Sequence, residues 1–417
     1  MNNWFKTARL GMFIHWGHSS QQECELSWPL VGGVFSLPHC QNIAIEEYHS
    51  TAKTFNPQAY KPTEWAKFAK KTGIQYAILT TKHHDGFALF HTQQSDFSIQ
   101  NTPYKNDIVR EFVDAMRAEG LKIGLYFSLI DWYHPDYPAF KETNKPYRFD
   151  KIPQPIPQKW EKYLEFMLNQ IRELLTNYGE IDIIWFDGSW ERTAEQWQTD
   201  KLLKMIRELQ PHILINDRLP NCGDFETPEQ FIPPQPPANL WETCLTMNES
   251  WGYNAEDKNY KSPRNLIHTL CEVAGKGGNL LLNVSPISNG QIPPEQLELL
   301  TEISDWMSRY SESIIGTNPG LEPWQFYGSS TRRENRIYLH LLMKPYETIS
   351  VRGIPIKHIK SVSLLANGQE LAYTSRCSIV DSILNSDPLG ELTISIPESA
   401  IDPYVTVICI DMTSNSN

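Results

Sequence analysis

The sequence predicts an α/β fold in which a (β/α)8-type barrel is followed by a small antiparallel β-sandwich domain. Three observations predict it. The chain has 417 residues, more than one hydrophobic core usually supports. Its first three hundred residues alternate short apolar runs with amphipathic helical segments, and its last hundred carry short β-type runs. We therefore expect two domains, over residues 1–317 and 318–417.

The first domain contains seven apolar runs of the length and composition of buried strands. Helical segments separate them, and this alternation is typical of a parallel sheet. No Gly-x-Gly-x-x-Gly motif follows any run, so a barrel is favoured over an open dinucleotide-binding sheet. The expected strands are 10–16, 76–81, 122–128, 181–187, 212–217, 240–244 and 279–284, and the expected helices are 62–70, 108–117, 160–178, 194–210, 263–273 and 294–309.

The second domain shows no helical period. Its short β-type runs are separated by turn residues, a pattern that predicts an antiparallel sandwich. The Pro-rich segment 233–238 lies inside the barrel half, where it indicates a functional loop rather than a domain linker. The expected strands of the sandwich are 336–342, 348–351, 362–365, 392–396 and 404–410.

Composition and charge narrow the class of partner. The net charge of −12 and the pI near 5.5 argue against nucleic acid or an anionic membrane surface and suit a neutral substrate. The seven cysteines are scattered without a Cys-x-x-Cys pair, so neither a zinc site nor a disulfide framework is expected. The odd cysteine count and the lack of an apolar leader segment predict a cytoplasmic location, with a secreted or periplasmic location as the alternative if a leader has been removed.

Polar and aromatic residues gather where the predicted strands end. In a barrel of this kind, the carboxyl ends of the strands face the active site. The mixture of carboxylates, imidazoles and indoles is typical of sites that bind and cleave sugars. These strand ends are His15-Trp16, Lys82-His83-His84-Asp85, Asp131-Trp132, Trp185-Phe186-Asp187, Asn216-Asp217-Arg218 and Trp241-Glu242.

Asp187 stands out because it ends an apolar strand between aromatic residues and Gly188. Glycoside hydrolysis with retention needs two carboxyl groups, one ionised to attack the anomeric carbon and one protonated to assist the leaving group. The pattern alone leaves catalysis and helix capping open for Asp187. His83 and His84 have no third ligand at a metal-binding spacing, so hydrogen bonding to sugar hydroxyls explains them better than zinc.

Six motifs in chain order resemble glycoside hydrolase family 29, the α-L-fucosidases. The resemblance covers nearly the whole barrel half, and the β-rich tail is similar to the sandwich that usually follows in this family. The motifs are Gly11-Met-Phe-Ile-His15-Trp16-Gly17, Thr81-Lys-His83-His84-Asp85-Gly86-Phe87, Trp185-Phe-Asp187-Gly188, Asn216-Asp217-Arg218, Trp241-Glu242-Thr-Cys with Ser250-Trp251-Gly-Tyr253-Asn, and Gly277-Gly-Asn-Leu-Leu-Leu-Asn283-Val.

The resemblance implies a role for each matching residue. Asp187 falls on the nucleophile of the family. The residues that fall on substrate-binding positions are His15, His83, His84, Trp185, Arg218, Trp251 and Glu25, although Leu26 replaces the Trp that normally follows the last of these. No cofactor or metal is implied. The expected substrate is a fucosylated oligosaccharide or glycoconjugate, from which one terminal sugar is removed. An α-L-galactosidase or another exo-glycosidase on the same fold, or a non-catalytic carbohydrate-binding protein, is the alternative.

The acid/base residue lies on a variable loop in this family, so the motifs do not assign it. Glu229 follows Asp187 by 42 residues on the Pro-rich loop, and Glu242 ends a strand. A loop carboxylate can close over a bound sugar, whereas a strand-end Glu is rigidly placed and could instead orient Arg218 or a histidine. We therefore favour Glu229 over Glu242, with Glu226 as a weaker third candidate.

Overall fold

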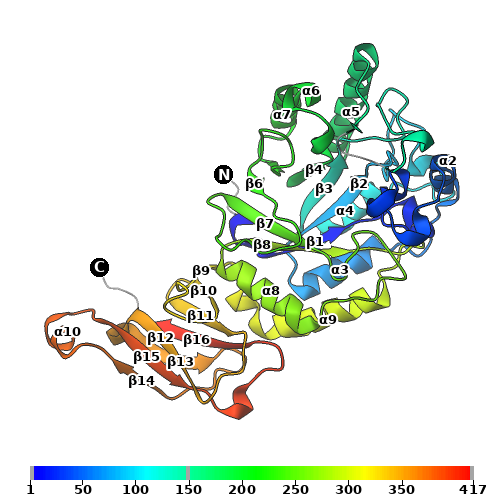
Figure 1. Cartoon of the computed structure of the whole chain (residues 1–417). Helices are drawn as coiled ribbons and strands as arrows, with labels where there is room; N and C mark the ends of the chain where they lie inside the picture. Colours follow the sequence, from blue (N-terminus) through cyan, green and yellow to red (C-terminus); the bar gives the residue numbers. More distant parts are fainter. Residues whose placement is uncertain (1–3, 147–150, 414–417) are drawn as a thin grey trace.

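The computed structural model describes residues 4–146 and 151–413, and its first part is a parallel β-barrel (Figure 1). The eight strands lie in the order β5-β4-β3-β2-β1-β8-β7-β6, and a bridge between Asn216 and Phe225 links the two edges of this sheet. The predicted barrel is therefore confirmed. The strands are β1 Leu10–Ile14, β2 Tyr76–Lys82, β3 Lys122–Ser128, β4 Ile183–Asp187, β5 Leu214–Ile215, β6 Phe225–Glu226, β7 Leu240–Leu245 and β8 Asn279–Val284.

Helices cover the outside of the barrel. The expected single helix over 194–210 is two helices, because Gln198 adopts a left-handed conformation with φ 52° that ends α6 and precedes α7. The longer expected helices are all present. The helices of the barrel part are α1 Phe5–Ala8, α2 Ile45–Ser50, α3 Pro62–Thr72, α4 Ile108–Ala118, α5 Pro157–Asn177, α6 Ala194–Trp197, α7 Thr199–Leu209, α8 Pro263–Gly275 and α9 Pro294–Tyr310.

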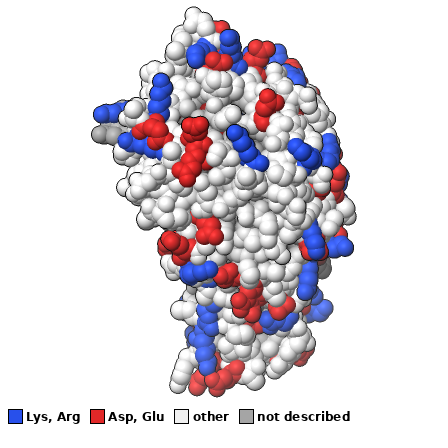
Figure 2. Space-filling model, turned by 90° about the vertical axis from the view of Figure 1, so that its right-hand side faces the viewer, with Lys and Arg blue, Asp and Glu red and all other residues white. Residues whose placement is uncertain are grey.

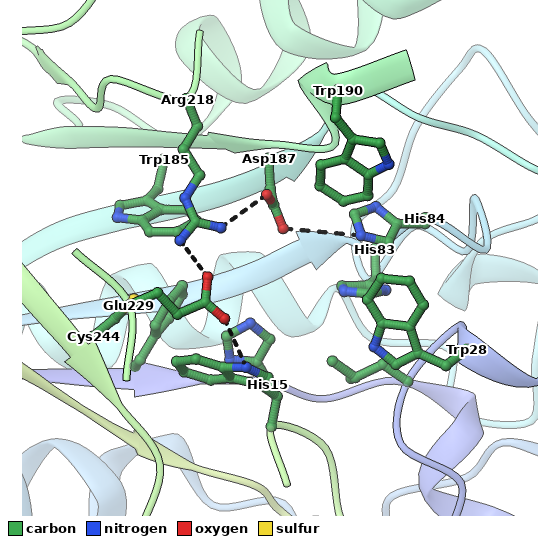
Figure 3. A pocket seen from close by; sticks show the side chains of 13 residues that line it. His15, Trp28, His83, His84, Trp185, Asp187, Trp190, Arg218, Glu229 and Cys244 are labelled. Atoms are coloured by element: carbon green, nitrogen blue, oxygen red, sulfur yellow. Dashed lines mark hydrogen bonds and ion pairs between the residues drawn. The ribbon is translucent and has the colours of Figure 1, made fainter. Parts of the chain in front are cut away.

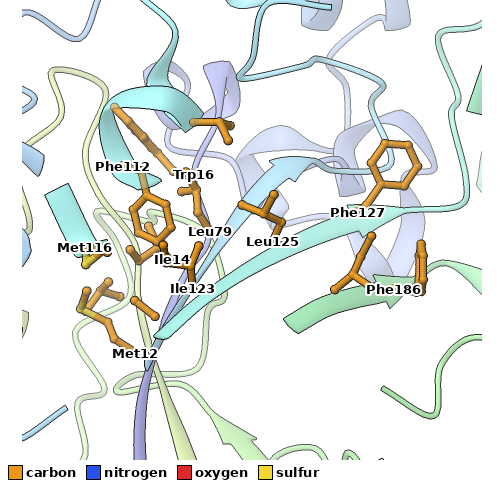
Figure 4. Packing of buried hydrophobic residues seen from close by; sticks show 14 of the residues in the cluster. Met12, Ile14, Trp16, Leu79, Phe112, Met116, Ile123, Leu125, Phe127 and Phe186 are labelled. Atoms are coloured by element: carbon orange, nitrogen blue, oxygen red, sulfur yellow. The ribbon is translucent and has the colours of Figure 1, made fainter. Parts of the chain in front are cut away.

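Two apolar layers result from the alternation of side chains along each strand. One set faces the helices, where Met12 and Ile14 of β1 pack with Phe112 and Met116 of α4 (Figure 4). The other set fills the barrel interior and includes Phe13, Tyr76, Tyr126, Ile183 and Trp185. Since side chains two residues apart point the same way, the interior set fixes which strand-end residues face inward.

The chain beyond the barrel forms two antiparallel sheets with a core of their own. One sheet also packs on the barrel helices, where Trp306 Nε1 of α9 donates to the Val405 carbonyl. The tail contains one helix, α10 Ile379–Leu384, where none was expected. The first sheet has the order β13 Ile359–Leu364, β16 Thr406–Met412, β11 Arg336–Leu341, β10 Ser329–Arg333 and β9 Asn318–Pro319, and the second has the order β12 Thr348–Pro355, β15 Leu389–Ser395 and β14 Tyr373–Arg376.

One cysteine expectation is wrong, because Cys24 and Cys40 form a disulfide. The sequence separation of 16 and the lack of a Cys-x-x-Cys pair concealed it, since the two residues meet only when the loop after β1 folds back. The other five cysteines are free thiols. Among the described residues, no helix is both long enough and apolar enough to cross a membrane.

Candidate active site

A pocket of about 340 Å³ opens at the carboxyl ends of the barrel strands (Figure 3). This volume is at the lower end of the range of small-molecule sites, which suits one small ligand unit. Eight of the nine site residues expected from the sequence line it; Glu25 does not. The lining residues are Phe13, His15, Leu26, Trp28, His83, His84, Trp185, Asp187, Trp190, Arg218, Glu229, Cys244 and Trp251.

Asp187 reaches the pocket because it follows the interior residue Trp185 by two positions on β4. Gly188 then turns the chain with φ 75°, a left-handed conformation that glycine adopts without a steric penalty. Tyr126 OH donates to Asp187 Oδ2 at 2.9 Å, and Arg218 Nη1 donates to Oδ1 at 3.1 Å. Burial favours the neutral acid, but the Arg218 charge, the adjacent His84 and His83 and the Tyr126 hydrogen bond together outweigh it and lower the pKa of Asp187 to about 2. The carboxylate is therefore ionised at neutral pH, as a nucleophile requires.

The three pocket histidines are neutral at neutral pH. Burial lowers the pKa of His15 and of His84 to about 4 and that of His83 well below its usual value. Each ring is oriented through Nδ1, which lies 2.6–2.7 Å from a neighbouring side-chain oxygen. These oxygen atoms belong to Asn283 for His15, Ser27 for His83 and Ser128 for His84.

His84 presents an unsatisfied nitrogen to the pocket. Ser128 Oγ donates its proton to the Ile130 carbonyl, so it accepts from His84 Nδ1–H. The tautomer that results leaves Nε2 as an acceptor. This atom is buried, has no hydrogen-bond partner among the described residues, and lies 3.9 Å from Asp187 Oδ2. A ligand hydroxyl that donates to Nε2 would satisfy it, and would lie beside the Asp187 carboxylate.

Glu229 and Asp187 both contact the guanidinium group of Arg218. Arg218 Nη2 lies 2.5 Å from Glu229 Oε2, while its Nη1 contacts Asp187, and the guanidinium carbon is 4.6 Å from the centre of the Trp185 ring. Trp251 Nε1 donates to the other oxygen of Glu229 at 3.1 Å. The Glu229 side chain is 39% exposed. Two carboxyl groups of the pocket, one buried and one open to solvent, therefore stand next to each other.

The backbone on either side of Glu229 is fixed to strand β7. Cys244 N donates to the Pro228 carbonyl and Gln230 N donates to the Cys244 carbonyl, at 3.1 and 2.9 Å. The loop between β6 and β7 is thus attached to the barrel at this point. The sequence indicated a loop free to close over a sugar, but these two hydrogen bonds already hold Glu229 at the pocket.

Glu242 lies below the pocket rather than in it. It is fully buried in the barrel interior, where its carboxyl oxygens accept from Tyr76 OH at 2.5 Å and from Trp185 Nε1 at 2.8 Å. Burial raises the pKa of Glu242 to about 7. Glu242 precedes the pocket residue Cys244 by two positions on β7, so it lies one layer of side chains deeper in the barrel. There it contacts Trp185 on the side away from the pocket, and a ligand in the pocket does not reach Glu242.

We predict that Glu242→Gln keeps kcat/KM within about tenfold of the wild-type value. The glutamine oxygen accepts from Trp185 as the Glu does, and its NH2 group donates to the Tyr76 hydroxyl, which turns from donor to acceptor. The raised pKa also means that folded Glu242 resists ionisation. Its contribution to stability is full below about pH 4.5 and is lost as the pH rises through about 7. The melting temperature of the variant relative to wild type should therefore increase across this window. A loss of activity beyond a thousandfold would contradict the supporting role.

Glu25 lies outside the pocket, in contact with the backbone of the pocket residue Trp251. Its carboxylate accepts from the Trp251 backbone N–H at 2.7 Å, and burial raises its pKa to about 7. The Trp251 carbonyl in turn accepts from Asn283 Nδ2 at 2.8 Å. Glu25 therefore fixes the Trp251 backbone in this structure.

Among the residues that the structure describes, two groups of side chains have donor atoms close enough to be considered as metal ligands. His83, His84 and Asp187 have ligand atoms within 4.8 Å of one another, so the fold supplies the third ligand that the sequence spacing lacked. The Arg218 guanidinium contacts the same Asp187 carboxylate, and its charge opposes a cation there. In the second group, Cys24 and Cys40 are joined to each other and provide no thiolate. Neither arrangement fits a resident metal.

The sequence did not predict several residues in or beside the pocket. Tyr126 contacts Asp187 directly, and its position two residues before the strand-end Ser128 was the signal that could have found it. Trp28 and Trp190 lie in short 3-10 helices after β1 and β4, which strand patterns do not reveal. Both indoles pack edge-on against His84, with ring centres 5.6 and 5.2 Å away (Figure 3).

The Cys24–Cys40 disulfide closes the loop that carries Glu25, Leu26, Ser27 and Trp28. We predict that five of the seven cysteines react as free thiols in the denatured, unreduced protein. Replacing both disulfide cysteines with serine should lower the free energy of unfolding by about 2–4 kcal/mol. It should also raise KM more than it changes kcat, because the loop forms part of the pocket wall. Urea unfolding and steady-state kinetics measure both effects.

The matched control replaces Cys222 and Cys377, which are partly exposed free thiols away from this loop, and should leave both quantities unchanged. Seven titratable thiols in the unreduced protein would contradict the disulfide.

The fold and the site define a class. A barrel whose strand ends carry an ionised carboxylate, a second carboxyl group, neutral histidines and indoles is a glycoside hydrolase. A family model described as α-L-fucosidase matches residues 1–312. The chain belongs to this α-L-fucosidase family, and it is accordingly an α-L-fucosidase.

The similarity to known α-L-fucosidases extends along nearly the whole chain. The structure of α-L-fucosidase isoenzyme 1 from Paenibacillus thiaminolyticus is 39% identical, superposes with a TM-score of 0.85, and aligns over 98% of each chain. A family 29 α-L-fucosidase from Bacteroides thetaiotaomicron, described as a trapped covalent intermediate, is 28% identical with a TM-score of 0.84, covering 99% of this chain and 96% of its own. The α-L-fucosidase of Dictyostelium discoideum is 28% identical over 97% of this chain and 91% of its own.

Proposed function

We propose that the enzyme removes terminal α-L-fucosyl units from glycans with retention of configuration, by double displacement. The observation that carries the proposal is the Asp187–Arg218–Glu229 arrangement. One guanidinium contacts an ionised buried carboxylate and a solvent-facing carboxyl group in a pocket that suits a single sugar. Retaining glycosidases need two carboxyl groups about 5–5.5 Å apart.

In the first step Asp187 Oδ attacks C1 of the fucosyl unit, and the bond from C1 to the leaving oxygen breaks. Glu229 gives its proton to that oxygen. Tyr126 and Arg218 hold the attacking carboxylate by one contact on each oxygen, so it is oriented before the sugar arrives. In the second step Glu229 takes a proton from water, whose oxygen attacks C1 and releases Asp187.

The pocket chemistry supports recognition of one terminal unit. Neutral His15, His83 and His84 offer ring nitrogens to sugar hydroxyls, and Trp251 provides an apolar surface for the C5-methyl group. On the face shown in Figure 2, acidic and basic side chains are interspersed without a continuous basic patch. The net charge of −12 likewise suits an uncharged glycan.

Paired assays on nitrophenyl α-L-fucoside and α-L-galactoside test the sugar assignment. The two sugars differ by one hydroxyl at C6, and an apolar surface rejects an added hydroxyl by roughly a hundredfold at most. We expect kcat/KM to be about 10- to 100-fold higher for the fucoside. A higher value for the galactoside would overturn the fucose assignment while leaving the two-carboxylate mechanism intact.

A further inference from the structure

Trp251 takes its place in the pocket without the support of a strand or a helix. It lies in the connection of residues 246–262 between β7 and α8, which contains neither. Its indole nevertheless lines the pocket, and its Nε1–H donates to Glu229 Oε1 at 3.1 Å. In a segment without regular backbone hydrogen bonds, the position of a side chain depends on individual contacts. The hydrogen bond to Glu229 therefore depends on what holds the Trp251 main chain.

Two side chains hold that main chain, one on each side. Glu25 Oε1 accepts from the Trp251 N–H at 2.7 Å, and Asn283 Nδ2 donates to the Trp251 carbonyl at 2.8 Å. The amide oxygen of Asn283 also lies 2.7 Å from His15 Nδ1, so this residue supports a second pocket side chain. Glu25 does not line the pocket. A substitution of Glu25 therefore removes the main-chain contact and leaves the pocket surface in place.

The segment that carries Glu25 is itself firmly attached. Cys24 is joined to the rest of its loop by a disulfide, and the Leu26 carbonyl accepts from Tyr48 OH at 2.7 Å. The same segment packs closely on the residue after Trp251, since a Cβ at Gly252 would lie only 2.9 Å from Leu26 Cγ. A side chain placed by such contacts can hold a pocket group in one geometry.

The Trp251 indole faces the oxygen on which charge develops during proton transfer. When Glu229 gives its proton to the leaving oxygen, it becomes a carboxylate, which accepts from Arg218 on Oε2 and from Trp251 on Oε1 (Figure 3). A hydrogen bond to an ionised acceptor is roughly twice as strong as one to a neutral acceptor. The indole N–H therefore lowers the barrier of a step in which Glu229 loses a proton, and not of a step that needs no proton.

We propose that Glu25 is a positioning residue for the acid/base Glu229. By holding the Trp251 main chain, it places the indole N–H against the carboxyl group that protonates the leaving oxygen. This inference rests on the proposed role of Glu229. It gives Glu25 a function other than the sugar contact that the family resemblance implied, because its carboxylate acts through the Trp251 main chain from outside the pocket.

The test compares kcat/KM on two aryl α-L-fucosides, one with a methoxyphenyl and one with a dinitrophenyl leaving group. This ratio reports the steps up to the covalent intermediate, and only the methoxyphenolate needs a proton to depart. Glu25→Ala should lower it roughly 10- to 100-fold on the methoxyphenyl substrate, as expected for a hydrogen bond to a charged group. On the dinitrophenyl substrate the loss should stay below about threefold, and this activity shows that the variant is folded.

Two further variants isolate the hydrogen bonds. Trp251→Phe keeps an aromatic ring and removes the indole N–H, so it should show the same difference between the two substrates. Glu25→Gln should stay within about threefold of wild type on both, because its amide oxygen accepts from the Trp251 N–H. Burial raises the pKa of Glu25 to about 7, and both its neutral and its ionised form have an oxygen that accepts this bond.

The matched control is Glu249→Ala. Glu249 is an exposed carboxylate two residues before Trp251, and it accepts from Asn259 Nδ2 at 2.7 Å. Its removal should leave kcat/KM on both substrates unchanged. The double variant Glu25→Ala with Glu229→Ala should lose no more on the methoxyphenyl substrate than Glu229→Ala alone, since both residues act on one proton transfer.

An equal loss on both substrates in Glu25→Ala would overturn the positioning role, because a damaged pocket wall does not distinguish leaving groups. Independent, additive losses in the double variant would overturn it as well. Both results leave the proposed function intact as long as Glu229→Ala itself discriminates between the two leaving groups. If Glu229→Ala lowers both activities equally, the acid/base assignment fails, and the inference about Glu25 fails with it.

Discussion

Replacing Asp187 with glycine is expected to lower kcat/KM by on the order of 10⁴-fold or more, about 5 kcal/mol of transition-state stabilisation. The variant loses the nucleophile, while the sugar-binding side chains remain. Arg218 keeps its contact with Glu229, so the loss is expected in kcat rather than in KM. Steady-state kinetics on an aryl fucoside measure it.

Azide distinguishes a missing nucleophile from a damaged fold. The cavity left by Asp187→Gly admits azide, which attacks C1 from the side of the lost carboxylate and yields the β-L-fucosyl azide. The isosteric control Asp187→Asn fills the cavity and is not expected to respond. Wild-type-like activity in either variant, or an α-configured azide from Asp187→Gly, would contradict the assignment.

Replacing Glu229 with alanine is expected to lower kcat/KM by about 10²- to 10⁴-fold on substrates with a poor leaving group. The loss of kcat/KM should be much smaller on a substrate whose leaving group departs without protonation, such as a dinitrophenolate. Asp187 is present in this variant, so the covalent intermediate still forms. Azide then attacks it from the opposite face and should give the α-L-fucosyl azide.

The matched control for this result is Glu242→Ala. Glu242 contacts Tyr76 and Trp185 beneath the pocket, so azide has no path to C1 through the space that this substitution creates. Fucosyl azide from Glu242→Ala and none from Glu229→Ala would reverse the two roles.

Seven strands and six helical segments of the barrel and five strands of the tail were predictable from the sequence, whereas α2, β9, β10 and β14 were not expected. Strand β6 was missed because its two residues stand in no apolar run, and its pairing with β7 depends on the chain returning to the barrel after β5. The helix α10 was missed because its aliphatic residues lie in a β-rich tail, and the exposed position that distinguishes them is a property of the folded domain.

The candidate site was predictable to the extent that strand ends carry it. His15, His83, Trp185 and Asp187 lie at or just after the ends of apolar runs that are visible in the sequence. The relation between Glu229 and Glu242 was not decided by sequence, because it depends on depth within the barrel. Glu242 faces inward one layer below Cys244, whereas Glu229 is placed beside Arg218 by backbone contacts between its loop and β7.

The disulfide also changes what the cysteine count implies. A bond between Cys24 and Cys40 is typical of oxidising compartments, so the cysteines do not support the cytoplasmic location that the sequence predicted. The location stays a prediction, and fractionation of the source cells with detection of the intact disulfide tests it.

Covalent labelling tests the central claim, that Asp187 forms a bond to C1, most directly. The enzyme is incubated with 2-deoxy-2-fluoro-α-L-fucosyl fluoride, whose fluorine at C2 slows the breakdown of a glycosyl-enzyme intermediate, and is then digested and sequenced by mass spectrometry. We expect one deoxyfluorofucosyl group per chain, on the peptide that contains Asp187 and on its carboxylate. A label on Glu229, on Glu242 or on another carboxyl group would contradict the mechanism.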